Sequence, residues 1–252
     1  MLTHPTVDKL HELRCTGMAK AMAEQLASPQ VENLSFEERL GLLVDRELTE
    51  RHSRQLTNRL RRARLRHDAC IEDIDFRASR GLDKDLVLSL ADGRWVREHL
   101  SILITGPAGI GKSWIACALA HSACRHGHSA SYRRLPRLLS ELAIARADGS
   151  YPKLLTSLAK TEVLVIDDFG LAKLNAENRR DLLEITEDRY GIRSTVVTSQ
   201  LPVENWHDIV GDPTLADAIL DRLVHSSYQL NLKGESMRKK RQPLTQTDHR
   251  DS

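Results

Sequence analysis

Aromatic residues are scarce in this chain, at only 4% of its 252 residues. Surfaces that bind single-stranded nucleic acid by stacking its bases need exposed aromatic rings, so this composition argues against such a surface. The chain also has no apolar run near the ~20 residues of a membrane-spanning helix, and its first residues contain no apolar signal core. We therefore expect a cytoplasmic protein that does not enter membranes.

Cysteine is also infrequent, with four residues and no C-x-x-C spacing. This pattern is typical of reduced thiols rather than of a disulfide framework. Net charge is only +2, while 40% of the residues are hydrophobic and 29% are charged. The composition predicts a globular chain, and the length allows one full α/β domain with a smaller additional unit.

One stretch matches the phosphate-loop pattern G-x-x-x-x-G-K-[ST] at every position: Gly106-Pro107-Ala108-Gly109-Ile110-Gly111-Lys112-Ser113. The apolar residues 102–104 before it predict a strand, and the alanine-rich residues 114–124 after it predict a helix. In such a loop, backbone N–H groups and the helix N-terminus bind a polyphosphate.

The loop's side chains have their own roles in this chemistry. The lysine places its charge on the β and γ phosphates, and the serine hydroxyl binds Mg²⁺. A glycine-rich turn that binds nothing is the alternative, but the complete pattern and its strand–helix context favour ATP and Mg²⁺ as cofactors. We expect the loop residues and the next residue, Trp114, to contact the nucleotide.

A second apolar run, 163–166, ends in Asp167 and Asp168. At the end of a buried strand, the first acid is placed to hold Mg²⁺, directly or through water. The second is placed to orient or deprotonate the attacking water, although it could instead cap the following turn. A further strand, 195–198, is followed by Ser199 and Gln200, which either contact the γ-phosphate or form a turn.

The segment from Arg51 to His67 contains arginines but no acidic residue. Clustered arginines repel one another, and a nearby polyanion would offset this repulsion. The pattern therefore predicts contacts with DNA phosphates. A solvated helix face is the alternative. The residues expected to bind DNA are Arg54, Arg59, Arg61, Arg62, Arg64 and Arg66.

The order of these patterns predicts the organisation of the chain. Residues 1–67 have helical spacing, with a capping box at Ser35 and Glu38, and are expected to form an all-helical domain that binds DNA or a partner. Residues 68–98 form a connector. In residues 99–241, strands alternate with helices, which predicts a parallel sheet with helices on both faces. Residues 242–252 are polar and expected to be disordered.

Several segments occur together in a characteristic order: GPAGIGKS, VLVIDDFG, TVVTSQLPVENW, GDPTLADAILDRL and KGESMRKKR. With them, residues 5–241 resemble the IstB-like transposition helper ATPases, members of the AAA+ group alongside the DnaC helicase loaders and DnaA initiators. The resemblance implies a P-loop AAA+ fold without a C-terminal lid domain.

The resemblance also implies roles that spacing alone does not show. Gln200, beside Ser199, matches the polar nucleotide sensor. Arg222 matches an arginine finger that reaches the ATP site of a neighbouring subunit, and Arg238 matches a second arginine sensor. With Lys112 and Asp168, Arg222 would complete the catalytic set. AAA+ proteins usually carry Asp-Glu where this chain carries Asp167-Asp168, so slow hydrolysis is our hypothesis.

By this resemblance, the protein is expected to be an ATPase that assembles as a homo-oligomer on double-stranded DNA, with ATP at the subunit interfaces. It would recruit or activate a transposase encoded alongside. A DnaC-type helicase loader that binds single-stranded DNA is one alternative, although the segment GDPTLADAILDRL favours the first function. A nucleotide-binding scaffold with negligible hydrolysis is the other.

Overall fold

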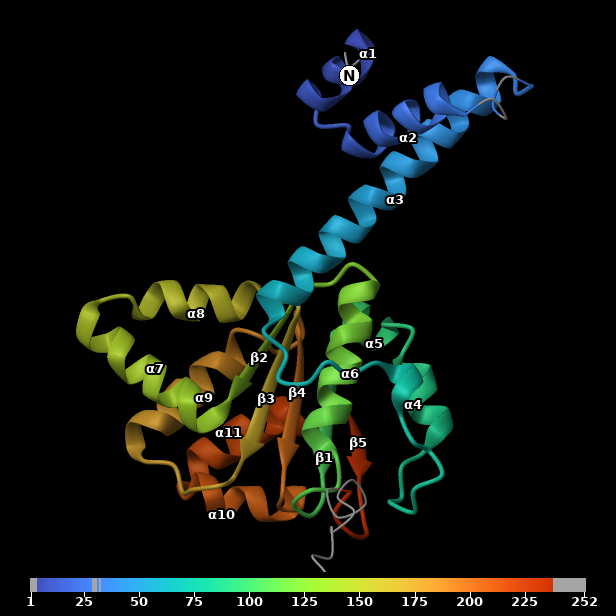
Figure 1. Ribbon diagram of the computed structural model, residues 1–252. Coiled ribbons are helices and arrows are strands. Elements are labelled where there is room, and N and C mark those ends of the chain that lie inside the picture. Colours follow the sequence, from blue (N-terminus) through green and yellow to red (C-terminus); the bar gives the residue numbers. More distant parts are fainter. Residues whose placement is uncertain (1–3, 29–30, 32, 238–252) are drawn as a thin grey trace, which may run out of the picture. The chain divides into compact units, whose positions relative to one another are not determined.

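The computed structural model of the protein describes residues 4–28, 31 and 33–237 (Figure 1). The chain divides into two compact units, Met1–Asn58 and Arg59–Ser252. The division lies within one helix, α3 (Phe36–Ala63), ahead of the predicted connector at 68–98. The predicted tail, 242–252, lies outside the described residues.

The first unit is helical, as predicted. It contains α1 (Pro5–Glu12), α2 (Thr16–Ala27) and the larger part of α3. Glu47 of α3 is buried and accepts hydrogen bonds from the N–H groups of Gly17, at 2.7 Å, and Met18, at 3.1 Å. It thereby satisfies N–H groups that the first turn of α2 leaves without helical partners.

The capping box predicted before α3 is confirmed. The Ser35 hydroxyl oxygen accepts a hydrogen bond from the N–H of Glu38 at 3.2 Å, and the Glu38 carboxylate accepts one from the N–H of Ser35 at 2.8 Å. These reciprocal bonds define where the long helix begins.

The second unit is built on a parallel five-stranded sheet with the strand order β2-β3-β4-β1-β5. Strands β1 and β3 are rich in Val, Ile and Leu, and β4 has two valines at its centre. All three are buried along almost their whole length, as expected for central strands covered on both faces. The strands are β1 (Ser101–Thr105), β2 (Ala130–Arg134), β3 (Val163–Phe169), β4 (Ser194–Ser199) and β5 (Ser227–Asn231).

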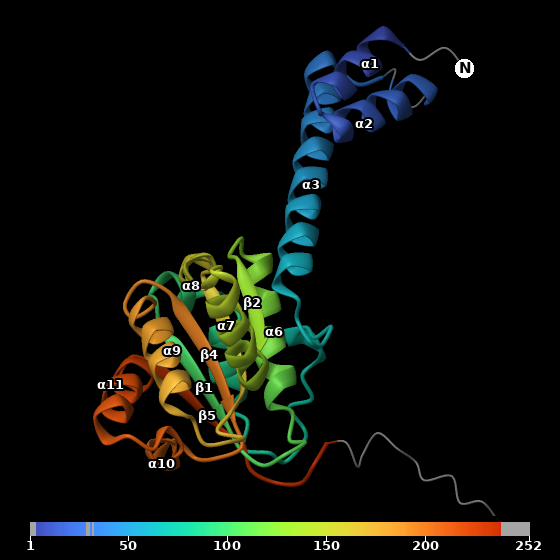
Figure 2. The same cartoon turned by 90° about the vertical axis from the view of Figure 1, so that its left-hand side faces the viewer.

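Helices cover both faces of this sheet, which confirms the predicted α/β architecture. Helix α6 packs against β1 to β4, and Figure 2 shows it on the opposite side of the sheet from α9 and α11. This arrangement follows from right-handed crossovers, because the chain runs from β1 to the far edge through α6 and then returns strand by strand. The helices of this part of the chain are α6 (Lys112–Arg125), α7 (Leu135–Asp148), α8 (Tyr151–Lys160), α9 (Ala176–Glu187), α10 (Trp206–Val210) and α11 (Pro213–Val224).

The predicted connector, 68–98, contains short elements of the second unit: η2 (Ile71–Asp73), α4 (Lys84–Leu90) and α5 (Arg94–Arg97). A further short turn, η3 (Val203–Asn205), precedes α10. After β5, the described residues up to 237 form no helix, so this part of the chain contains no lid domain. No helix among the described residues is both long and apolar enough to cross a membrane.

The carboxyl ends of β1, β3 and β4 meet at one edge of the sheet. Thr105 at the end of β1 is paired in register with Ser199 of β4, and Ser199 is paired with Phe169 of β3. A register shift between Ile166 and Phe169 marks a bulge in β3. Ligands of open α/β sheets bind outside the carboxyl ends of the strands, so this edge is where a site is expected.

A buried arginine lies at the opposite edge of the sheet, at the amino ends of β3 and β4. Arg189 is 2% exposed, and within the described part of the chain its buried charge has no carboxylate partner. It donates instead to the carbonyl oxygens of Leu158, Thr161, Glu162 and Ser194. Burial lowers the pKa of this guanidinium, and the carbonyl dipoles offset the cost of its charge.

Replacement of Arg189 by methionine should destabilise the protein by about 3 kcal/mol, because several buried carbonyl groups would lose their donor. Denaturant unfolding should show this loss. The matched variant Arg180→Met, at an exposed position of α9, should unfold within about 0.5 kcal/mol of the wild type. Equal stabilities for both variants would contradict the structural role of Arg189.

Candidate nucleotide-binding site

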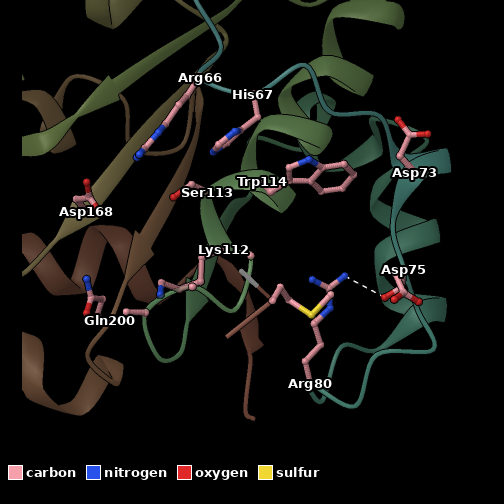
Figure 3. Close-up of a pocket in the computed structure, with 14 residues that line it drawn as sticks. Arg66, His67, Asp73, Asp75, Arg80, Lys112, Ser113, Trp114, Asp168 and Gln200 are labelled. Atoms are coloured by element: carbon pink, nitrogen blue, oxygen red, sulfur yellow. Dashed lines mark hydrogen bonds between the residues drawn. The ribbon is translucent and has the colours of Figure 1, made fainter. Parts of the chain in front are cut away.

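A cavity of about 390 Å³ lies at the carboxyl edge of the sheet (Figure 3). It brings together many of the predicted nucleotide-binding residues: Ala108, Gly109, Gly111, Lys112, Ser113, Trp114, Asp168 and Gln200. Its lining also includes residues for which the sequence predicted no nucleotide contact: Arg66, His67, Asp73, Asp75, Arg80 and Met237. The phosphate loop therefore forms one wall, and the segments before β1 and after β5 complete the pocket.

The loop backbone requires glycine at its bends. Gly106, Gly109 and Gly111 have φ angles of 142°, 79° and 103°, in the left-handed region that favours glycine. A Cβ atom on Gly106 would also collide with the carbonyl oxygen of Leu232. Lys112 donates from Nζ to the carbonyl oxygens of Gly106, at 2.6 Å, and Pro107, at 2.8 Å. Its ammonium group consequently lies on the inner side of the loop.

Asp167 lies behind the loop and is fully buried, with 0% of its surface exposed. Its Oδ1 accepts a hydrogen bond from the Ser113 hydroxyl at 2.7 Å, and it also accepts bonds from the hydroxyls of Tyr132 and Thr198. Burial alone would raise the pKa of Asp167, but these hydrogen bonds and the charge of Arg66 hold it below its usual value. The carboxylate is therefore ionised at neutral pH.

Asp168 has a different surrounding, although it is the next residue. Its φ angle is 65°, a left-handed conformation that aspartate tolerates better than most side chains. Its carboxylate accepts a hydrogen bond from Arg134 Nε at 2.8 Å, and its N–H donates to the Thr198 hydroxyl at 3.2 Å. The bulge in β3 thus lets Asp168 line the pocket while Asp167 faces Ser113.

Two further polar residues follow β4. Gln200 is exposed and lines the pocket, and Figure 3 shows it near Lys112. Ser199 is buried and donates its hydroxyl to the carbonyl oxygen of Phe169 at 2.8 Å. Ser199 therefore supports the bulge in β3, while Gln200 presents its amide to the pocket.

Arg80 supports the phosphate loop from the other side. It is 5% exposed, and its guanidinium donates to the carbonyl oxygens of Ile110, at 3.2 Å, and Asp75, at 3.1 Å. Burial lowers the pKa of Arg80. The sequence offered no motif for this residue, which lies in the predicted connector.

The arginines predicted to bind DNA have different surroundings. In the first unit, Arg54 donates to the Thr16 hydroxyl at 2.6 Å. In the second unit, Arg59 donates to the carbonyl oxygen of Cys124 at 2.7 Å. Arg66 lines the pocket and contacts Asp167, which the prediction of a DNA contact did not anticipate. The exposed members of the set within the second unit are Arg61, Arg62, Arg64 and, in part, Arg66.

The two arginines assigned by resemblance lie apart from this pocket or outside the described residues. Arg222 does not line the pocket of its own chain; it is on α11, forms an ion pair with Glu187 of α9, and donates to the carbonyl oxygen of Ala218 at 2.8 Å. Arg238 lies outside the described residues. Its neighbour Met237 lines the pocket and donates its N–H to the carbonyl oxygen of Gly109 at 2.9 Å.

The donor set suits a nucleotide with Mg²⁺. The Ser113 hydroxyl and the Asp167 carboxylate are oxygen donors, which Mg²⁺ prefers over nitrogen or sulfur. No cluster of three or more His, Cys, Asp or Glu side chains among the described residues could hold a metal ion. A site with one carboxylate fits Mg²⁺, because this ion takes its other ligands from phosphates and water.

Comparison with solved structures agrees with this fold. The crystal structure of DnaI superposes with a TM-score of 0.58 at 20% identity, and the match covers 66% of this chain and 91% of that chain. The DnaC helicase loader gives a TM-score of 0.56 at 20% identity, with coverage of 66% and 97%. At these identities the similarity shows the fold alone, which is that of the P-loop AAA+ proteins.

Comparison with known sequences shows the family. "Putative insertion sequence ATP-binding protein y4pL" of Sinorhizobium fredii is 54% identical over 239 residues, which cover 95% of this chain and 98% of the relative. "Insertion sequence IS1162 putative ATP-binding protein" of Pseudomonas fluorescens is 52% identical over 203 residues, which cover 80% of this chain and 88% of the relative. The family model described as IstB-like ATP binding protein matches residues 8–245. The chain therefore belongs to the IstB-like family of insertion sequence ATP-binding proteins.

Proposed function

We propose that this protein is an ATP-dependent DNA transposition helper: an AAA+ ATPase that oligomerises on double-stranded DNA and recruits or activates a partner transposase at the target. The observation that carries the ATP-dependent part is the 2.7 Å hydrogen bond between Ser113 and Asp167 beside the phosphate loop. The family and its insertion sequence relatives support the transposition part.

Different residues of the pocket would bind different parts of the nucleotide. Loop N–H groups and the Lys112 ammonium would bind the phosphates, and Ser113 with Asp167 would hold Mg²⁺. When bound, Mg²⁺ neutralises charge that develops on the phosphate oxygens. Trp114 and Gln200 line the same cavity. Arg238 would contact the nucleotide from the segment that follows Met237.

Asp168 is the best candidate to orient or deprotonate the attacking water, because its carboxylate lines the pocket and Asp167 is committed to Ser113. Its hydrogen bond with Arg134 holds the carboxylate toward β2. Both this contact and the short side chain support slow hydrolysis, which would suit a protein whose ATP-bound state marks an assembled complex.

Assembly would complete the site. Arg222 does not reach the pocket of its own chain, so we propose that it reaches the ATP site of a neighbouring subunit and exchanges Glu187 for the γ-phosphate. The exposed Arg61, Arg62 and Arg64 would contact DNA phosphates, with Arg54 and Arg59 nearby in sequence. A helicase loader acting on single-stranded DNA has the same ATPase core, so DNA preference separates the two functions.

Replacement of Lys112 by alanine should weaken ATP binding by about tenfold or more, because a charge-assisted contact with the phosphates would be lost. Titration calorimetry with a non-hydrolysable ATP analogue measures this effect. Lys153→Ala removes an exposed lysine of α8 and should bind the analogue like the wild type. Unchanged binding by the Lys112 variant would refute the assignment of the phosphate loop.

Replacement of Asp168 by glutamate should raise ATP turnover several-fold, because the longer side chain carries the carboxylate one methylene further into the pocket. Replacement by asparagine should lower turnover about 100-fold while leaving ATP binding intact. Steady-state phosphate release measures both rates. A glutamate variant no faster than the wild type would contradict our explanation of slow hydrolysis.

Light scattering tests the assembly directly. With ATP and duplex DNA, the wild type should form large particles, whereas ADP or single-stranded DNA should leave small ones. Arg222→Ala should bind ATP normally but fail to form the large particles; the exposed Arg180→Ala should assemble like the wild type. Assembly on single strands would favour helicase loading, and a monomer under all conditions would contradict the proposed oligomer.

A further inference from the structure

Arg66 reaches the nucleotide pocket from the segment that follows α3, not from a strand end or the phosphate loop. Figure 3 shows its side chain pointing into the pocket from above Ser113. Its Nη1 lies 3.5 Å from Asp167 Oδ2. The structure thus places a guanidinium of the same chain beside the atoms that would hold the metal ion and the terminal phosphate.

The contact between Arg66 and Asp167 is looser than the other contacts of this carboxylate. Asp167 already accepts hydrogen bonds from three hydroxyl groups, one of them at 2.7 Å from Ser113. The Asp167 side chain is 0% exposed, whereas the Arg66 side chain is 40% exposed. Arg66 can therefore change partner without leaving a buried carboxylate unsatisfied.

The backbone at Arg66 is held on the helix that follows the phosphate loop. Burial raises the pKa of the Cys117 thiol of α6, while the backbone N–H groups of His67 and Arg66 lower it. Arg59 donates to the Cys124 carbonyl at the end of the same helix, and Ala63 is fully buried. These contacts place the backbone of the segment beside α6, and the partly exposed side chain of Arg66 reaches the pocket from there.

A bound nucleoside triphosphate would change the charges around Arg66. A metal ion between Ser113 and Asp167 would repel the guanidinium, while the terminal phosphate would attract it and accept two parallel hydrogen bonds. We propose that Arg66 exchanges Asp167 for the terminal phosphate and thereby transmits nucleotide occupancy to the exposed arginines of its own segment. This inference rests on the proposed function, because it requires the pocket to bind ATP with Mg²⁺.

Arg66 can pass the effect of bound nucleotide to the exposed arginines because they are only a few positions away along the chain. Arg64, two positions before Arg66, is exposed and has a φ angle of 50°, where the chain turns after α3. Arg61 and Arg62 are exposed on the last turn of α3. A shift of Arg66 would alter the position of these groups toward DNA. By thermodynamic linkage, DNA on these arginines would change triphosphate affinity by the same factor.

The first test compares triphosphate with diphosphate binding. Replacement of Arg66 by glutamine should weaken binding of a non-hydrolysable ATP analogue with Mg²⁺ about tenfold or more, and binding of ADP much less, because ADP lacks the terminal phosphate. Titration calorimetry on the full chain measures both. Arg97→Gln makes the same charge change at an exposed position of α5 and should alter neither affinity.

The same titrations separate this role from a purely structural one. If Arg66 only supported Asp167, its loss would weaken ATP analogue and ADP binding equally, and this outcome would overturn the inference. If the glutamine variant does not fold, Arg66→Lys decides, because it keeps the charge but not the paired donors and should still lose triphosphate affinity selectively. A wild type that binds neither nucleotide would refute the proposed function itself.

The second test measures duplex DNA affinity by fluorescence anisotropy, with and without the ATP analogue. In the wild type the analogue should strengthen DNA binding. Arg66→Gln should lose most of this enhancement, measured as the ratio of the DNA affinities with and without the analogue. Arg64→Gln should weaken DNA binding by a similar factor in both conditions. Full enhancement in the Arg66 variant would overturn the transmission.

Discussion

The buried carboxylate of Asp167 is the constraint on which the site depends. An ion removed from water costs several kcal/mol unless its oxygens are fully hydrogen-bonded. Here the donors come from β2, β4 and α6, which supply Tyr132, Thr198 and Ser113. The elements must therefore keep their register for the charge to be tolerated. The serine of the phosphate loop is positioned by the same requirement.

The two edges of the sheet repeat this logic with opposite charges. At the carboxyl edge, an anion is satisfied by hydroxyl groups, and at the amino edge, the Arg189 cation is satisfied by carbonyl oxygens. Asp167 of β3 is bonded to Thr198 of β4, and Arg189 is bonded to Glu162, just before β3, and to Ser194 of β4. The polar groups at the carboxyl edge lie close to the large cavity, whereas Arg189 at the amino edge bonds to the carbonyl groups of the loops there. Stability and ligand binding are thus assigned to different ends of the same strands.

The sequence predicted the parts of the site that are local in the chain. The phosphate loop is one contiguous stretch, and the strand before Asp167 is recognisable from its apolar residues, so both could be placed without knowledge of the fold. The residues that contact Asp167 and Asp168 could not be predicted in this way. Tyr132, Thr198 and Arg134 lie 35, 31 and 34 positions from the carboxylates that they contact. Only the strand order brings β2 and β4 beside β3, and no spacing rule reports that order.

Arg66 shows a second limit of pattern reading. It lies 101 positions from Asp167, within a run of arginines that looks uniform in sequence. The run is not uniform in space, because the helix ends at Ala63 and the chain turns at Arg64. After that turn, residues no longer share the helix's faces, so charge density alone cannot distinguish an arginine at the surface from one in the pocket.

The bulge in β3 has a consequence for how such a site can vary. In a regular strand, two adjacent side chains point to opposite faces, so only one of a pair of acids could reach the strand's open end. The extra residue separates the two acids into independent positions, one inside the fold and one in the cavity. Mutation can then alter the cavity acid without disturbing the folded core. Under the proposed function, the rate of hydrolysis becomes a property that evolution can adjust separately from the stability of the protein.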